Sequence, residues 1–174
     1  MSQLNEDIKL ALSSLPEALK SLSKSRKTEL KRVRNPEEFK TLGGFYELCS
    51  AHKVLQNNLW QMRNVTFFLP WIEHTVGISL GCSLFRAEIN EMRIYQVIRS
   101  TYSNDLIYLY RLMRTAISKG KTKKLSIDWD RTSLTLFYWG ENSKREILRD
   151  YFREEFFTEN KPEEKEIISN DEDN

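Results

Sequence analysis

The chain has 174 residues, of which 40% are hydrophobic and 11% aromatic, a composition that suits one or two small folded domains. No hydrophobic run approaches the roughly 20 residues of a transmembrane helix, and the N-terminus lacks the pattern of a signal peptide, so we expect no membrane association. Two cysteines are too few for a disulfide framework, and we expect a cytoplasmic protein in a reducing compartment.

Charge is distributed unevenly along the sequence. The formal net charge is +2, but residues 158–174 contain seven acidic and two basic side chains, a charge of −5 that leaves +7 for residues 1–157. An excess of this size attracts polyanions. Because hydrophobic residues become scarce after Phe157, we predict that residues 158–174 form a disordered acidic tail.

The hydrophobic pattern predicts an all-α protein. Hydrophobic residues recur at intervals of three and four, and six Gly and four Pro supply few turns for β-hairpins. We expect two small helical bundles packed together, residues 1–75 and residues 76–157, followed by the tail. The boundary is placed between Pro70 and Gly77, where no hydrophobic stripe is sustained.

The N-terminal half begins with a predicted helix and a basic segment. A hydrophobic stripe covers residues 4–22, and Pro16 either kinks this helix or begins a second one. Residues 20–34 hold seven basic side chains against one acidic side chain. We call residues 20–34 the basic strip.

Capping residues predict where the later helices begin and end. Asn35 is expected to cap a short helix, and helical structure is expected over residues 45–69, either continuous or broken near residues 56–58. In the C-terminal half we expect helices to begin at Ser79, Asn90, Asp105, Asp128 and Ser143. Gly120 is expected to end one of these helices in the left-handed conformation, and Glu146 to complete a capping box with Ser143.

Motifs for catalysis and for metal binding are weak. The Gly-Lys-Thr tripeptide at residues 120–122 lacks the preceding glycine and strand of a phosphate-binding loop. The two cysteines and two histidines lack the paired spacing of a zinc site, and neither histidine lies in a motif with a nucleophile. Asp128 and Asp130 suit a helix cap and a first turn better than a metal pair. We therefore expect no enzymatic activity, no metal site and no cofactor.

Basic residues carry the stronger functional signal, because phosphate neutralisation needs several Lys and Arg on one surface and no fixed spacing. Arg93 and Arg99 flank the hydrophobic stripe of one predicted helix on different sides, whereas Arg111 and Arg114 share a face of the next helix. The alternative is that these charges only form a solvated surface.

The last predicted helix places cations where they are unfavourable. Lys144 and Arg145 lie in its first turn, where the helix dipole disfavours positive charge by a few tenths of a kcal/mol to about 1 kcal/mol. This arrangement hints at another use for the two side chains, such as contact with phosphate.

Seven sequence blocks occur in order between residues 30 and 152: LKRVRNPEEF with GFY, GISLG, INEMRIYQVIR, DLIYLYRLMRTA, IDW, YWG and ILRDYF. Together they resemble the small subunit of the type I-E CRISPR Cascade complex, the CasB family. The resemblance implies an all-helical, non-catalytic protein, two copies of which line the belly of a ribonucleoprotein. Its expected partners are guide RNA, both strands of the target DNA, the large and backbone subunits of Cascade, and a second copy of the chain as a dimer.

The basic residues and the resemblance together give the predicted nucleic-acid-binding residues, which are Lys31, Arg32, Arg93, Arg99, Arg111, Arg114, Lys144 and Arg145. By contacting backbone phosphates without reading bases, they would stabilise the open R-loop. Two other functions stay open from the sequence: a helical regulator that reads duplex DNA, and a purely structural helical adaptor.

Overall fold

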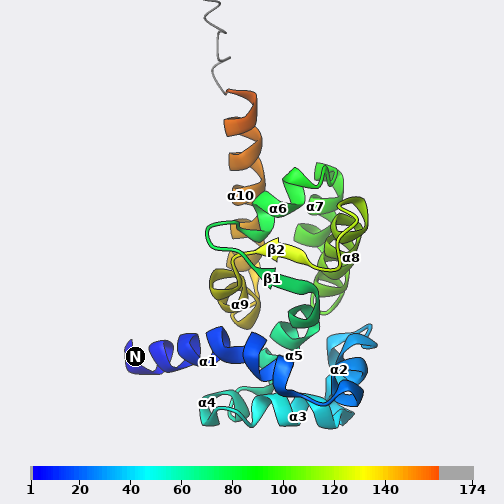
Figure 1. The fold of residues 1–174 in the computed structure, drawn as a ribbon. Helices are drawn as coiled ribbons and strands as arrows, with labels where there is room; N and C mark the ends of the chain where they lie inside the picture. The colour runs from blue at the N-terminus through cyan, green and yellow to red at the C-terminus, as the bar shows by residue number, and fades with distance from the viewer. Residues whose placement is uncertain (1, 161–174) are drawn as a thin grey trace, which may run out of the picture.

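The computed structural model describes residues 2–160, so most of the predicted acidic tail lies outside the described residues. Within this range the chain is mainly helical, which confirms the predicted all-α class. Two strands of three residues, β1 (Ile72–His74) and β2 (Leu125–Ile127), pair in parallel and form the only sheet of the described chain. Figure 1 shows this sheet near the middle of the molecule.

Short helices make up the N-terminal half. The elements are α1 (Ser2–Ser21), α2 (Lys24–Lys31), the 3-10 helix η1 (Pro36–Thr41), α3 (Gly43–Cys49), α4 (Lys53–Gln56), α5 (Leu59–Phe68) and the 3-10 helix η2 (Leu69–Trp71). Asn35 caps η1 as predicted, because its side chain accepts a hydrogen bond from the Glu37 N–H at 2.9 Å. The helical segment predicted over residues 45–69 is divided among α3, α4 and α5, and the break between α4 and α5 lies at the expected place near residues 56–58.

The C-terminal half carries the longer helices. They are α6 (Leu80–Arg86), α7 (Glu91–Arg99), α8 (Asn104–Lys119), α9 (Trp129–Phe137) and α10 (Glu141–Glu159). Ser79, Asn90 and Asp128 cap α6, α7 and α9 as predicted, since each side chain accepts a backbone N–H. No helix within residues 2–160 combines the length and the hydrophobicity needed to cross a lipid bilayer.

α8 ends at Lys119 with Gly120 as its cap, as predicted, but its predicted start and the predicted left-handed conformation of Gly120 are wrong. α8 begins at Asn104, so Asp105 lies inside the first turn, where its buried carboxylate pairs with Lys144. At the other end Gly120 keeps a right-handed φ of −71°, and Lys121 takes the left-handed φ of 52°. The start is displaced because burial of an ion pair decides the position of Asp105, which the local pattern does not show.

The predicted start of the last helix is also wrong. α10 begins at Glu141, two residues before the expected cap. Ser143 is buried inside α10, and its hydroxyl donates to the carbonyl of Tyr138 at 2.9 Å. Glu146 does not complete a capping box, because its carboxylate accepts from Arg131 instead.

Pro16 begins no second helix, because α1 continues through it to Ser21. Proline has no N–H, so the carbonyl of Leu12 loses its usual helical donor. The indole N–H of Trp129 donates to this carbonyl at 2.8 Å. Since Trp129 is buried at the start of α9, the bond joins two helices that are far apart in the sequence.

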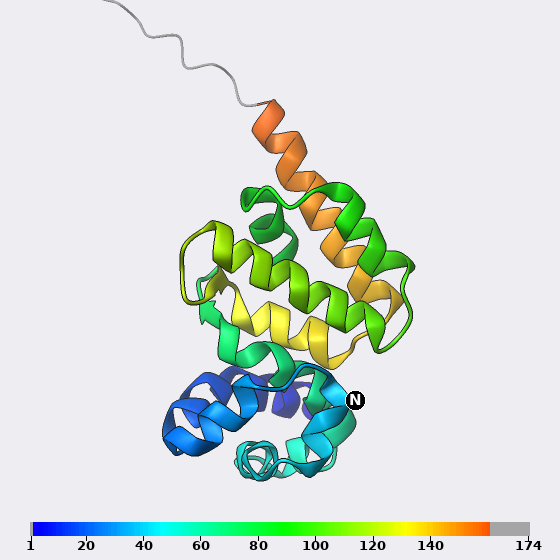
Figure 2. The ribbon, with the colours of Figure 1, turned by 90° about the vertical axis from the view of Figure 1, so that its right-hand side faces the viewer.

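One continuous cluster of buried hydrophobic residues runs through both halves of the chain. α9 packs against α1 and α5 from the N-terminal half and against β1. Figure 1 shows α1 to α4 in the lower part of the molecule and α6 to α10 in the upper part, with the end of α10 rising above the body; Figure 2 shows the same arrangement from the side. The division into residues 1–75 and 76–157 stays a prediction.

The two glycines of the GISLG block have separate structural roles. Gly77 has a left-handed φ of 82°, and its N–H donates to the Asp128 carboxylate at 3.0 Å. At Gly81 a Cβ atom would lie 2.3 Å from the carbonyl oxygen of Ile147 in α10. Glycine at position 81 therefore allows α6 and α10 to approach each other closely.

Candidate nucleic-acid interface

The structure leaves most of the predicted nucleic-acid-binding cations free of acidic partners. The exposed ones are Lys31, Arg32, Arg93, Arg99, Arg111 and Arg145, and Arg114 is half-buried. Within residues 2–160 no carboxylate oxygen lies within 4.0 Å of any of these seven charged groups. Their positive charge is therefore available to an anion from outside the molecule.

Trp71 brings together cations that are far apart in the sequence. The guanidinium carbon of Arg114, on α8, lies 3.6 Å from the centre of the Trp71 ring. The ammonium nitrogen of Lys31, at the end of α2, lies 5.9 Å from the same centre. A cation–π contact positions a cation without neutralising it. Both charges can therefore still bind phosphate.

A pocket of about 150 Å³ lies beside Lys31. Its lining contains four lysines, which are exposed or half-buried, and five hydrophobic residues, which are buried or half-buried: Lys20, Lys27, Lys31 and Lys124, and Pro16, Leu19, Leu69, Pro70 and Ile72. We call it the lysine-rimmed pocket. The four lysines and Arg114 together form what we call the Trp71 basic surface.

Sequence reasoning found only part of the Trp71 basic surface. Lys20 and Lys27 belong to the basic strip but were not among the predicted binding residues, and neither was Lys124. Trp71 carries no sequence signal for this role, because only the fold places its ring between α2 and α8. Figure 1 shows both helices on the right-hand side of the molecule.

The other predicted cations lie around this surface or apart from it. Arg111 is one turn before Arg114 on α8, and its guanidinium carbon lies 5.7 Å from the Tyr108 ring centre. Arg93 and Arg99 lie on α7, which packs against α8. Within residues 2–160 neither of them makes a cation–π contact with Trp71, and Arg99 lies over the Tyr95 ring instead.

Lys144 differs from the other predicted residues because it is buried. Its ammonium group lies 3.0 Å from the carboxylates of Asp105 and Glu141 and donates to the carbonyl of Ser100 at 2.6 Å. Burial opposes the charged form, but the hydrogen bonds with Glu141 and Asp105 outweigh it and raise the pKa of Lys144. The side chain fixes α10 to α8 and to the end of α7, and we leave it out of the nucleic-acid interface.

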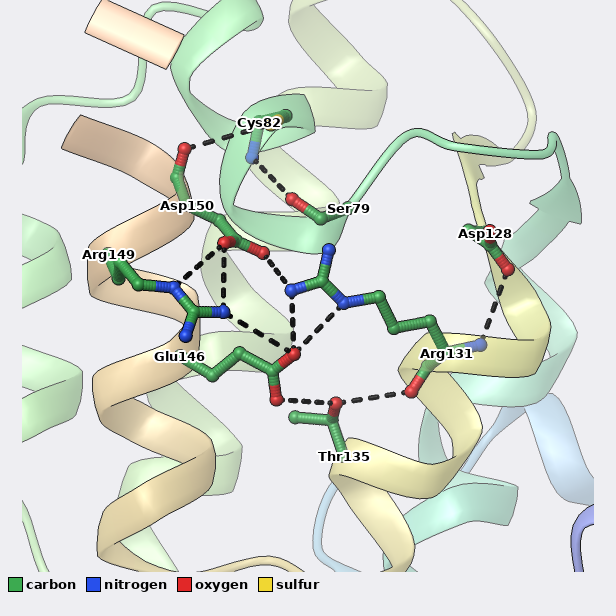
Figure 3. A network of polar contacts seen from close by, with 8 residues as sticks. All are labelled: Ser79, Cys82, Asp128, Arg131, Thr135, Glu146, Arg149 and Asp150. Carbon is green, nitrogen blue, oxygen red and sulfur yellow. Dashed lines mark hydrogen bonds and ion pairs between the residues drawn. The ribbon is translucent and has the colours of Figure 1, made fainter. Parts of the chain in front are cut away.

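A second network of internal ion pairs joins α9 to α10 (Figure 3). Arg131 lies between Glu146 and Asp150, with nitrogen–oxygen distances of 2.6 Å to each carboxylate. Arg149 approaches Asp150 from the other side at 3.3 Å. Burial opposes the charged form of Arg131, but the Glu146 hydrogen bond and the Asp150 charge raise its pKa. We call these four residues the α9–α10 ion-pair network.

His74, Asp128 and Asp130 lie together at the start of α9, with their possible ligand atoms within 4.8 Å of one another. The hydrogen bonds of His74 and Asp128 with nearby backbone N–H groups explain why these side chains lie close together. The His74 Nδ1 atom accepts from the Trp129 N–H at 3.1 Å. Burial opposes ionisation of Asp128, but backbone hydrogen bonds, first that from Gly77, hold its pKa below the ordinary value. The group is a helix cap that anchors the loop after β1.

Comparison with known proteins gives two informative matches, while no family model matches the chain. A curated relative is the Cascade subunit CasB of Escherichia coli strain K12, which is 28% identical over 151 residues and aligns with 79% of this chain and 90% of CasB. A solved relative is a chain in the crystal structure of E. coli Cascade bound to a PAM-containing double-stranded DNA target. That chain is 26% identical, with a TM-score of 0.69 over 82% of this chain and 97% of its own length.

The two matches agree with each other and with the sequence blocks. Sequence similarity covers nearly all of CasB, and structural similarity covers nearly all of the corresponding chain in the Cascade crystal structure. The resemblance predicted from the sequence is therefore confirmed, and the chain is similar to CasB of a type I-E Cascade complex both in sequence and in structure.

Proposed function

We propose that this chain is a non-catalytic subunit of a Cascade complex that holds guide RNA and target DNA and stabilises the R-loop through phosphate contacts. The observation that carries the proposal is the Trp71 basic surface, where cations from α1, α2, α8 and the segment before β2 meet. The large subunit, the backbone subunits and a second copy of the chain are the other partners that we propose.

Electrostatics explains how such a surface would act. Opening the target duplex while the guide pairs with one strand is nearly balanced in free energy, so small contributions decide its direction. Each Lys or Arg that neutralises a phosphate releases condensed counterions and favours the bound strand. A surface that contacts only phosphates stabilises every sequence equally, and the guide RNA then supplies the specificity.

The chemistry of the described side chains supports a non-catalytic role. A serine and a histidine do meet, with 2.8 Å between the Ser14 Oγ and His52 Nε2 atoms. However, the Ser14 hydroxyl donates to the carbonyl of Ala11 at 2.8 Å, so the histidine nitrogen is the donor in the pair. A catalytic base would instead have to accept the hydroxyl proton.

A salt titration of the isolated protein tests the proposal. We expect weak binding to single- and double-stranded nucleic acid without sequence preference. The logarithm of the affinity should fall linearly with the logarithm of the salt concentration, with a slope of about −0.7 to −0.9 per phosphate contact. Strong preference for one duplex sequence would support the DNA-binding regulator, and binding that is absent or independent of salt would support the structural adaptor.

A matched pair of double variants locates the binding surface. Lys31→Ala with Lys124→Ala, two exposed members of the Trp71 basic surface, should weaken binding and reduce the salt slope by about 2. The control is Lys9→Ala with Lys53→Ala, which removes the same charge from exposed positions on α1 and α4. Equal losses in the two variants would show that net charge, and not this surface, drives binding.

Arg93 and Arg99 need a test in the assembled complex. Replacing both by Glu should leave the helical circular-dichroism signal unchanged, because both side chains are exposed. R-loop retention by a Cascade complex that contains the variant should fall. Unchanged retention would remove these two side chains from the interface.

A further inference from the structure

The lysine-rimmed pocket is more than a patch of positive charge, because its interior is hydrophobic. Leu69, Pro70 and Ile72 line the pocket and are buried. Pro16 and Leu19 are neighbours one turn apart on α1 and are half-buried at the wall. Phosphate alone would gain nothing from these five side chains, so the pocket suits a ligand that has a nonpolar part.

The size of the pocket indicates what that nonpolar part is. Its volume is about 150 Å³. A hydrophobic cavity of about this volume in another protein holds one benzene molecule. The lysine-rimmed pocket therefore has room for a six-membered ring such as that of a pyrimidine.

The charges at the opening indicate what is attached to the ring. Lys27, Lys31 and Lys124 have no carboxylate partner within residues 2–160, and Lys20 is paired only with the exposed Glu17. Lys31 is positioned by Trp71 at the edge of the opening. The ligand is therefore a ring with negative charges close to it on more than one side.

We propose that the lysine-rimmed pocket binds one unpaired pyrimidine base of a single strand, with the flanking phosphates on its lysines. This inference rests on the proposed function and deepens it. A base in a single strand has one phosphate on each side, which matches lysines contributed by α1, α2 and the segment before β2. A base inside a duplex is stacked and paired, so its ring is not available to the pocket.

The test compares two oligonucleotides with the same number of phosphates. One is oligothymidylate, and the other is an abasic strand of equal length. Isolated wild-type protein should bind oligothymidylate at least about five-fold more tightly, which is the lower end of the effect of one base stacked in a protein site. Leu19→Trp fills the pocket, and this variant should bind both strands with the affinity of the wild type for the abasic strand.

Methyl NMR of the unmodified protein provides a second readout that does not depend on how the variant folds. The methyl resonances of Leu19 and Ile72 should shift when oligothymidylate is added, because a bound ring changes the local magnetic field. They should not shift with the abasic strand.

Each outcome separates the base pocket from the proposed function. Equal, salt-dependent binding of both strands would overturn the pocket and leave the phosphate contacts intact. A thymidylate preference that survives in Leu19→Trp would also overturn it, because the base must then stack elsewhere. Methyl shifts with an acidic peptide containing phenylalanine, but not with oligothymidylate, would assign the pocket to a protein partner. Failure to bind either strand would contradict the proposed function itself.

Discussion

The cations around Trp71 and the cations between α9 and α10 differ in what they contact. Lys31 and Arg114 lie over an aromatic ring and have no carboxylate partner within residues 2–160. Arg131 on α9 pairs with Glu146 and Asp150 on α10 and so holds the two helices together, while Arg149 pairs with the same carboxylates within α10. A cation over a ring stays available to a ligand, whereas a cation between carboxylates is used by the fold.

Two adjacent residues show how fine this difference is. Lys144 and Arg145 are neighbours near the start of α10, yet the first is buried in ion pairs and the second is exposed and unpaired within the described chain. One step along a helix rotates the side chain by about 100°. Function therefore depends on which side of the helix each cation occupies, and the following predictions test this distinction from the largest expected effect to the smallest.

Replacing Lys144 should cause the largest loss of stability. Lys144→Ala leaves the buried carboxylate of Asp105 without its cation, a change that typically costs about 3–5 kcal/mol. Urea denaturation measures the free energy of unfolding. The matched control Arg145→Ala should stay within about 0.5 kcal/mol of the wild type. Similar losses in the two variants would contradict the assignment of Lys144 to the fold.

The close approach of α6 and α10 predicts the next effect. Gly81→Ala places a Cβ atom against the Ile147 carbonyl, and overpacking of this kind costs about 1–3 kcal/mol in the free energy of unfolding. Gly120→Ala is the control, because Gly120 has a right-handed φ and its nearest neighbour to an added Cβ lies at 3.4 Å. If Gly81→Ala is as stable as this control, α6 and α10 do not pack as described.

Low pH should weaken the ion pairs that Glu37 forms with Lys40 and Arg63. Hydrogen bonding with Lys40 and the charge of the buried Arg63 outweigh burial and hold the pKa of Glu37 below its ordinary value. A lowered pKa contributes stability above the ordinary value of about 4.3, and the contribution disappears as the pH falls through the folded-state pKa. Glu37→Gln should therefore lower the free energy of unfolding by about 0.5–1 kcal/mol at pH 7. The effect is small because Glu37 is partly exposed and solvent screens its charge.

The pH dependence of that difference is the critical measurement. Urea denaturation of the wild type and Glu37→Gln should give a difference in unfolding free energy that shrinks between pH 7 and pH 3. A constant difference across this range would show that the Glu37 charge does not stabilise the fold.

The smallest effect is expected for a single surface cation. Arg111→Ala should change the free energy of unfolding by less than about 0.5 kcal/mol, because Arg111 is exposed and unpaired within residues 2–160. Its effect should appear only in nucleic-acid binding, as a salt slope reduced by about 1. A loss of stability without a change in the salt slope would show that Arg111 stabilises the folded protein and does not bind nucleic acid.

The sequence predicted the features of the fold that depend on local chemistry. Ser79, Asn90 and Asp128 cap helices because their short polar side chains reach the next backbone N–H groups. The same argument failed for Asp105 and Ser143, which are buried and take partners from other segments. A local pattern contains no information about those partners.

The candidate site was predictable only as a set of cations. Lys31, Arg111 and Arg114 were chosen for their charge, and all three are unpaired within the described chain. The meeting of Lys31 and Arg114 at Trp71 was not predictable, because it depends on how α2, η2 and α8 pack. The hydrophobic lining of the lysine-rimmed pocket is likewise built from residues that read as ordinary core in the sequence.

The proline in α1 has an effect beyond its own helix. Because Pro16 has no N–H, the Leu12 carbonyl is free to accept the hydrogen bond from the Trp129 indole. This bond connects the N-terminal and C-terminal halves of the chain. Pro16 also forms one wall of the lysine-rimmed pocket. The residue that shapes the pocket thus also creates the vacant acceptor that locks α1 onto α9. The buried hydrogen bond from Trp129 therefore holds in place the same helix that lines the pocket.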